Sequence, residues 1–127
     1  MQPHLQPVQI YETEGFVKDI EQYLNDHEVD ALRHYLASNP ISGEPMPGFP
    51  GLLILEWGKD RPIKISYTVS NDENQIFLVA VFGPDEQLPS PGSPAGKRAK
   101  ALLKILKPLG IGGLAKALWE IFKDGGL

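Results

Sequence analysis

The sequence predicts an α+β protein with a helical extension at its C-terminal end. Two stretches with helical spacing come early in the chain, strand-like apolar runs follow them, and two further amphipathic stretches come last. Helices and strands that are segregated along a chain in this way are typical of α+β folds. A chain of 127 residues is long enough for one domain with a core of its own.

A short strand and two helices are expected before residue 40. Val8 and Ile10 alternate with polar neighbours, which is the period of a strand. Helical spacing follows at Phe16, Ile20, Tyr23 and Leu24, and again at Val29, Leu32 and Leu36. The second helix is expected to end at Asn39, because a residue that precedes a proline is pushed out of the helical region.

Three strands are predicted between residues 52 and 82. Apolar and polar side chains alternate over residues 63–70, which indicates a strand with one buried face. Residues 52–55 and 76–82 are apolar without alternation, as in strands that are covered on both faces. Something must therefore cover the second face of the sheet, either part of this chain or a partner.

The chain divides at a Pro/Ser/Gly-rich linker, LPSPGSPAG, at residues 88–96. Residues 1–87 are expected to form the α+β domain, and residues 97–127 a basic amphipathic helical tail with lysines on one side and leucines and isoleucines on the other. Pro108 and the glycines of residues 110–113 are expected to break this tail into two short helices around a hinge.

Charge is unevenly distributed between the two parts. Residues 1–90 carry 5 Lys and Arg against 14 Asp and Glu, a net charge of −9, whereas residues 91–127 carry 7 against 2, a net charge of +5. The acidic body disfavours binding to a phosphate backbone. The tail could lie on a membrane surface, bind nucleic acid or dock on a protein surface. Docking is favoured because it would supply both a cover for the apolar sheet face and a counter-charge for the body.

Several classes of site are excluded or disfavoured by the residue types. The chain has no cysteine, which excludes disulfides, thiolate nucleophiles and cysteine-ligated metals. His27 and His34 lie near one helical face without a third ligand, so no metal is expected. Phosphate loops and dinucleotide fingerprints are absent, so no cofactor is expected. The first residues lack the charged and apolar regions of a signal peptide, and no segment approaches the ~20 apolar residues that are needed to span a bilayer. A cytoplasmic protein is therefore expected.

The stretch YLASNPISGEPMPGFPGLLILEW at residues 35–57 resembles the RelE/ParE superfamily of toxins from type II toxin–antitoxin systems, especially its HigB-like branch. The shared features are an Asn-Pro, a glycine, a Pro-Gly-x-x-Gly-Leu turn and a closing tryptophan, at Asn39-Pro40, Gly43, Pro47-Gly48, Gly51-Leu52 and Trp57. The resemblance covers about residues 8–87. It implies two helices packed on one face of a small antiparallel sheet.

Many members of this superfamily cleave messenger RNA on the ribosome, with basic residues and a tyrosine borne on the sheet. The resemblance implies Lys64 and Tyr67 as catalytic candidates, because they stand at positions that match a basic residue and a tyrosine of the family. Lys59 and Arg61 lie in the adjoining turn and are further candidates that could swing in. Lys64 and Tyr67 are three residues apart on one strand, so their side chains should point to opposite faces. This spacing favours Tyr67 as a core residue and Lys64 as a solvated charge.

Other positions that are often basic in the superfamily are occupied here by Leu53, Ile54 and Glu56. Fewer cations on the sheet should weaken both acid–base catalysis and the stabilisation of a phosphate. The sequence therefore favours a toxin-like protein that acts mainly by binding proteins. A ribosome-dependent messenger RNA endonuclease is the alternative, and a membrane-surface or adaptor protein that uses the tail is the third option.

The expected partner is an antitoxin-like protein or the chain's own tail, because antitoxins of this superfamily wrap their toxins with amphipathic helices. Ribosome, messenger RNA and a second copy of the chain are further candidates. The predicted contact surface comprises Leu52, Ile54, Leu102, Ile105, Leu106, Leu118, Trp119 and Phe122.

Overall fold

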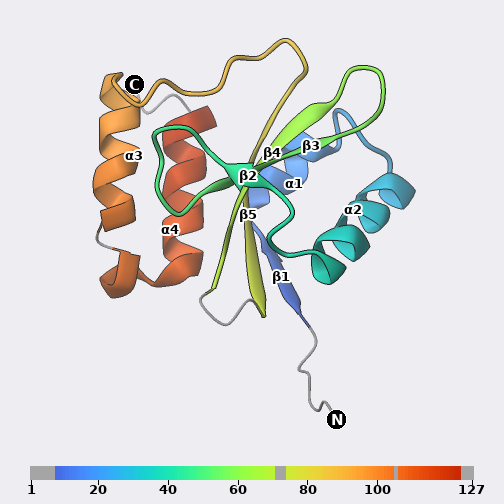
Figure 1. Ribbon diagram of the computed structural model, residues 1–127, viewed down its shortest axis with the longest axis horizontal. Coiled ribbons are helices and arrows are strands. Elements are labelled where there is room, and N and C mark those ends of the chain that lie inside the picture. The colour runs from blue at the N-terminus through green and yellow to red at the C-terminus, as the bar shows by residue number, and fades with distance from the viewer. Residues whose placement is uncertain (1–7, 71–73, 105, 124–127) are drawn as a thin grey trace.

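The computed structural model describes residues 8–70, 74–104 and 106–123, with only the helical backbone given for residues 104 and 106–114. A five-stranded sheet lies between two helical layers, with α1 and α2 on one side and α3 and α4 on the other (Figure 1). The strands are β1 (Gln9–Glu12), β2 (Glu44–Pro45), β3 (Leu53–Trp57), β4 (Ile63–Val69) and β5 (Gln75–Phe82). The helices are α1 (Glu14–Ile20), α2 (Asp26–Ser38), α3 (Pro94–Lys104) and α4 (Leu106–Lys123). The α+β class predicted from the sequence is confirmed.

The strands lie in the order β1-β5-β4-β3-β2, and β5 is therefore an inner strand. β1 runs parallel to β5, while the other neighbouring strands are antiparallel. The two-residue strand β2 was not expected from the sequence, because a Glu-Pro pair in a Pro/Gly-rich stretch carries no strand pattern.

Side-chain caps fix where the first two helices begin. The Thr13 side chain accepts a hydrogen bond from the Phe16 N–H at 3.0 Å. Asn25 and Glu28 form a capping box, in which each side chain accepts from the other residue's backbone N–H. α2 ends before Asn39, as the following proline predicted. α1 is shorter than expected, because the chain already turns after Ile20.

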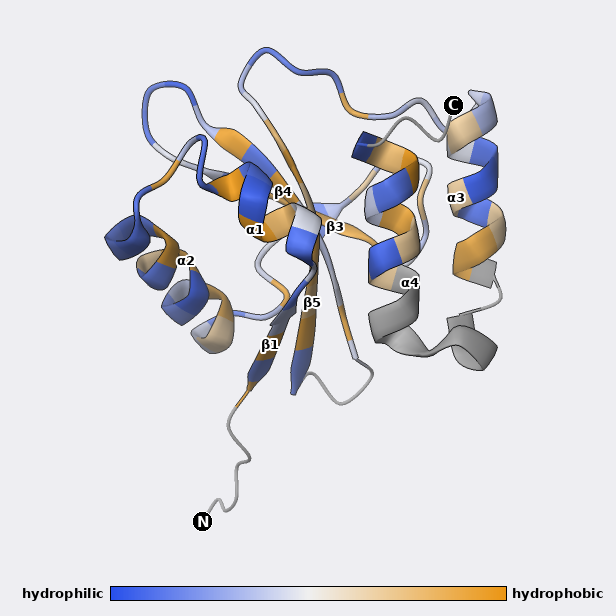
Figure 2. Cartoon of the chain, turned by 180° about the vertical axis from the view of Figure 1, so that it is seen from behind, coloured by the Kyte–Doolittle hydropathy of each residue, from blue (hydrophilic) through white to orange (hydrophobic). Residues whose placement is uncertain are grey.

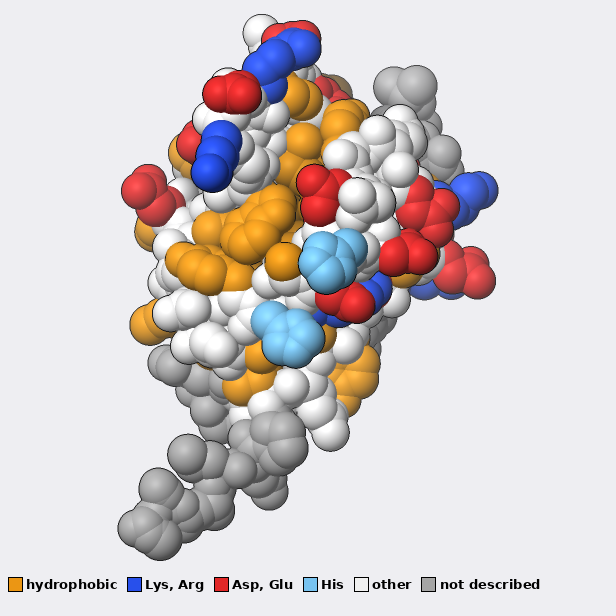
Figure 3. Space-filling model, turned by 90° about the vertical axis from the view of Figure 1, so that its right-hand side faces the viewer, with side chains coloured by type: hydrophobic (Ala, Val, Ile, Leu, Met, Phe, Trp, Pro, Cys, Tyr) orange, Lys and Arg blue, Asp and Glu red, His pale blue; other side chains and the backbone are white. Residues whose placement is uncertain are grey.

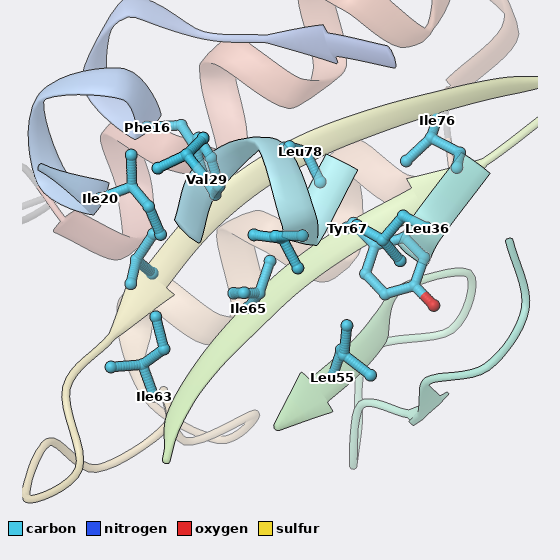
Figure 4. Packing of buried hydrophobic residues seen from close by; sticks show 12 residues of the cluster. Phe16, Ile20, Val29, Leu36, Leu55, Ile63, Ile65, Tyr67, Ile76 and Leu78 are labelled. Carbon is cyan, nitrogen blue, oxygen red and sulfur yellow. The ribbon is translucent and has the colours of Figure 1, made fainter. Parts of the chain in front are cut away.

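The helices α1 and α2 bury their apolar sides against one face of the sheet (Figure 4). The helices contribute Phe16, Ile20, Val29, Leu32 and Leu36, and the strands contribute Leu55, Ile63, Ile65, Tyr67, Ile76, Leu78 and Val81. The alternating residues of β4 thus point into this core, as their period predicted.

Both faces of β5 are covered, and a bulge in this strand places two consecutive residues on the same face. Ser66 pairs with Ala80 and the next residue of β4 pairs with Leu78, which leaves Val79 as an extra residue. Val79 and Ala80 consequently both lie in the second core, under α3 and α4, whereas Leu78 and Val81 lie in the first. One strand therefore supplies both cores.

The break between the two C-terminal helices differs from the predicted one. α3 ends at Lys104 and α4 begins at Leu106, so the expected hinge at Pro108 and residues 110–113 is wrong. Pro108 is the third residue of α4, and a proline in the first turn of a helix removes an N–H that has no intrahelical partner. α3 also starts earlier than expected, at Pro94 inside the predicted linker.

Candidate functional site: the sheet face under the C-terminal helices

The face of the sheet opposite α1 and α2, here called the covered face, carries Phe77, Val79, Ala80 and Phe82 of β5. The segment before β3 adds Met46, Phe49 and Leu52, each at most 2 % exposed. From the helices, Ala99, Ala115, Leu118 and Ile121 pack against these residues. Figure 2 shows the alternation of hydrophobic and hydrophilic bands along α3 and α4 that permits this packing.

Six of the eight residues of the predicted contact surface belong to this one cluster. Leu52 and Leu118 are buried, and Ile54, Leu102, Trp119 and Phe122 are partly buried at its margin. Ile105 lies outside the described residues, and the side chain of Leu106 is not described.

Sequence reasoning missed Met46 and Phe49, because isolated apolar residues among prolines and glycines have no periodicity. The Phe49 ring meets the Phe122 ring edge-on, with 5.5 Å between centroids. The segment before β3 therefore contributes to the contact with α4.

Trp119 attaches α4 to α1 as well as to the sheet. Its Nε1–H donates a hydrogen bond to the Asp19 carboxylate at 3.0 Å. The indole lies directly over Gly15, where an added Cβ would be 2.0 Å from the Trp119 Cε2 atom. Only glycine leaves room for this close approach, so Gly15 and Trp119 form a fitted pair.

The end of α4 is attached by charge. The Lys123 Nζ lies 2.5 Å from the Glu86 Oε2 and 4.8 Å from the centroid of the Phe82 ring. Burial raises the pKa of Glu86, but the hydrogen bonds from Lys123 and from the Gly83 N–H outweigh it and hold that pKa below its usual value. The acidic body thus supplies a partner for one lysine of the basic tail.

The buried hydroxyls on the covered face are used within the chain. The Thr68 hydroxyl donates to the Gly51 carbonyl at 2.9 Å, and the Ser66 hydroxyl lies 3.8 Å from the Met46 sulfur. Both serve to hold the segment before β3 against the sheet.

The four catalytic candidates do not converge. Tyr67 is fully buried on the face opposite the covered face, and its hydroxyl accepts a hydrogen bond from the Gly43 N–H at 2.9 Å. Burial raises the pKa of Tyr67, and the Gly43 hydrogen bond offsets part of that rise. Lys64 lies on the other side of the same strand and is partly exposed, in line with the predicted spacing.

Lys59 and Arg61 are exposed in the turn between β3 and β4. Arg61 pairs with Asp85, and both side chains are largely in solvent, at 66 % and 87 % exposure. The charges around Lys64 are of both signs, since Glu56 is the residue opposite Lys64 on β3. Arg61 and Lys64 thus each have a carboxylate beside them, which reduces the positive charge that they could offer to a phosphate.

The histidines of α2 lie on the molecular surface beside an apolar patch (Figure 3). The Nδ1 of His34 is 2.9 Å from the Asp30 carbonyl oxygen. Within the described ranges, no group of three or more His, Asp or Glu side chains gathers in a way that could hold a metal ion. In the same part of the chain, no helix is both long and apolar enough to cross a membrane.

Solved structures of RelE toxins are similar to this chain at low sequence identity. A mutant of the E. coli toxin RelE in the free state has a TM-score of 0.48 and 13% identity, over 63% of this chain and 86% of the toxin. A chain of the intact E. coli RelBE toxin–antitoxin complex has a TM-score of 0.47 and 16% identity, over 60% of this chain and 95% of the matched chain. A chain of an archaeal RelE–RelB complex from Pyrococcus horikoshii has a TM-score of 0.42 and 16% identity, over 65% of this chain and 100% of the matched chain. No protein-family model and no curated protein matches the sequence.

Proposed function

We propose that this chain is a cytoplasmic, toxin-like component of a type II toxin–antitoxin system that acts mainly by binding proteins. The toxin-like part of the proposal is based on the motif at residues 35–57, which resembles the HigB-like branch of the RelE/ParE superfamily. The protein-binding part is based on the covered face, which already holds amphipathic helices of the chain itself, α3 and α4. The proposed partner is the chain's own C-terminal tail or an antitoxin-like protein.

One observation favours a protein-binding function over cleavage of phosphodiester bonds. The sheet face opposite α1 and α2 is apolar and is already covered by α3 and α4, whereas cleavage of RNA requires cations and acid–base groups that converge on the phosphate. Burial of large side chains such as Phe49, Leu52 and Leu118 contributes about 1.5 to 3 kcal/mol each, far more than an exposed ion pair. The contact is therefore mainly hydrophobic.

The same burial disfavours a membrane-surface role for the tail. Leu118 is fully buried against the sheet, and Trp119 and Phe122 are partly buried in the same cluster. A membrane-surface helix needs its apolar side free to enter the lipid boundary. In the described part of α4, residues 115–123, that side is occupied.

A growth assay on induced expression tests the proposal. We expect the full chain to arrest growth, and we expect Lys59→Ala, Arg61→Ala and Lys64→Ala to arrest it equally well. Lys18→Ala, an exposed lysine on α1, is the matched control. Loss of arrest in one of the three variants, but not in Lys18→Ala, would favour the endonuclease alternative. Absence of arrest by the wild-type chain would refute the toxin-like assignment.

A further inference from the structure

The outer edge of the sheet at β1 presents unpaired backbone groups. The Gln9 N–H donates to the Asn74 carbonyl at 2.9 Å, and Tyr11 stands opposite Phe77, so these alternate residues bond toward β5. The N–H and C=O of Ile10 must then point away from the sheet. Within the described residues, nothing donates to or accepts from those two groups. Such an edge is a template for another strand.

A hollow of about 360 Å³ lies beside this edge, on the side of the sheet that faces α4. One wall is made by the stacked rings of Tyr11 and Phe77, whose centroids are 4.7 Å apart at an angle of 13°. Residues of α1 and α4, among them Gly15 and Ala115, line the hollow between these two helices. Its volume is within the range of sites that hold a ligand group, and aromatic rings are favourable neighbours for another ring.

We propose that the edge of β1 and this hollow form one site for an extended segment of a partner protein. The segment pairs with the backbone of Ile10 and places an aromatic side chain beside Tyr11. Side chains of neighbouring strands that stand opposite each other lie on the same face, so a residue opposite Tyr11 points toward the hollow. Backbone bonds then supply affinity, and the hollow selects the side chain.

Charge indicates the kind of segment. Residues 8–38, which include β1, α1 and α2, carry 2 Lys and Arg against 7 Asp and Glu, a net charge of −5. Glu14 of α1 and Lys116 of α4 both line the hollow. A partner segment with a lysine or arginine at the end that faces α1 and α2 is therefore favoured. The inference rests on the proposed protein-binding function, for which it specifies a strand-forming, basic and aromatic partner. A second copy of this chain, whose corresponding region is acidic, is disfavoured by the same charge.

Selection of a phage-displayed random heptapeptide library on the full chain tests the site. We expect enriched peptides with alternating apolar residues and an aromatic residue at one shared position. Ile10→Pro removes the outward N–H, a change that the solvent side of an edge strand tolerates. Ile10→Ala keeps that N–H and is the control for the lost side chain. Binding by fluorescence anisotropy should be about tenfold weaker for Ile10→Pro than for Ile10→Ala.

Tyr11→Ala removes one wall of the hollow and should abolish the preference for an aromatic residue, while thermal melts confirm that each variant is folded. Failure to enrich any peptide, or equal binding to Ile10→Pro and Ile10→Ala, refutes the site. A dimer in sedimentation that Ile10→Pro dissociates would assign the edge to a second copy and overturn the proposed partner. Peptide binding without growth arrest would refute the toxin-like function alone, and growth arrest without peptide binding would refute this site alone.

Discussion

Replacing Gly15 with alanine should destabilise the protein, although alanine is the better helix former. The new Cβ would lie 2.0 Å from a ring atom of Trp119, so the indole would have to leave its position. Its hydrogen bond to the Asp19 carboxylate contributes about 1.5 to 3 kcal/mol, and the loss of part of the burial of the indole costs about 1.5 kcal/mol more. Helix propensity offsets about 1 kcal/mol. The free energy of unfolding should therefore fall by about 2 to 3.5 kcal/mol.

Urea denaturation followed by circular dichroism measures this effect in a double-mutant cycle. The four proteins are the wild type, Gly15→Ala, Trp119→Ala and the double variant. Without the indole the clash is gone, so Gly15→Ala in the Trp119→Ala background should raise the free energy of unfolding by up to about 1 kcal/mol. A change of the same sign and size in both backgrounds would show that the two residues are not fitted to each other.

Three further variants test single contacts. Tyr67→Phe leaves the Gly43 N–H without its partner and should lower the free energy of unfolding by about 1 to 2 kcal/mol in urea titrations at neutral pH. Because burial raises the pKa of Tyr67, wild-type stability should fall as pH rises above about 10, and Tyr67→Phe should lose that part of the fall. Arg61→Ala should change stability by less than about 0.5 kcal/mol in a thermal scan, since its pair with Asp85 is exposed; a larger loss would contradict this. Glu86 has a lowered pKa, so its stabilising effect is present above its unfolded pKa and is lost as pH falls through the folded pKa, below about pH 4. The melting temperature of Glu86→Gln should therefore depend less on pH than that of the wild type in thermal melts between pH 7 and 3. Parallel pH dependences of the two proteins would argue against the ion pair.

The sequence predicted those features that follow from local periodicity. The alternation in β4 gave the correct face for Ile65 and Tyr67, because a strand repeats every two residues. The unbroken apolar run of β5 indicated cover on both faces, although the bulge at Val79 has no signal of its own in a strand that is apolar throughout. The sequence likewise indicated that the second face of the sheet must be covered, but it did not show that both α3 and α4 lie there.

Features that depend on distant residues or on position within a turn were not predictable. Trp119 and Asp19 are 100 residues apart, and no local pattern connects them or marks the glycine beneath the indole. Pro108 predicted a helix break because proline is unfavourable inside a helix, but its effect depends on its distance from the first residue. The catalytic candidates came from resemblance to a family, and that resemblance does not fix which face of the sheet each side chain occupies.

The central place of β5 has a consequence for the order of folding. α1 and α2 leave the ribosome well before β5, yet their apolar sides are completed by that strand, and so is the layer under α3 and α4. β1 must also wait for it, because β5 is the one strand that pairs with β1 among the residues that the structure describes. During synthesis the nascent chain should therefore acquire little native structure until residue 82 has emerged, when the core under α1 and α2 can form. The second core must wait until α3 and α4 have followed.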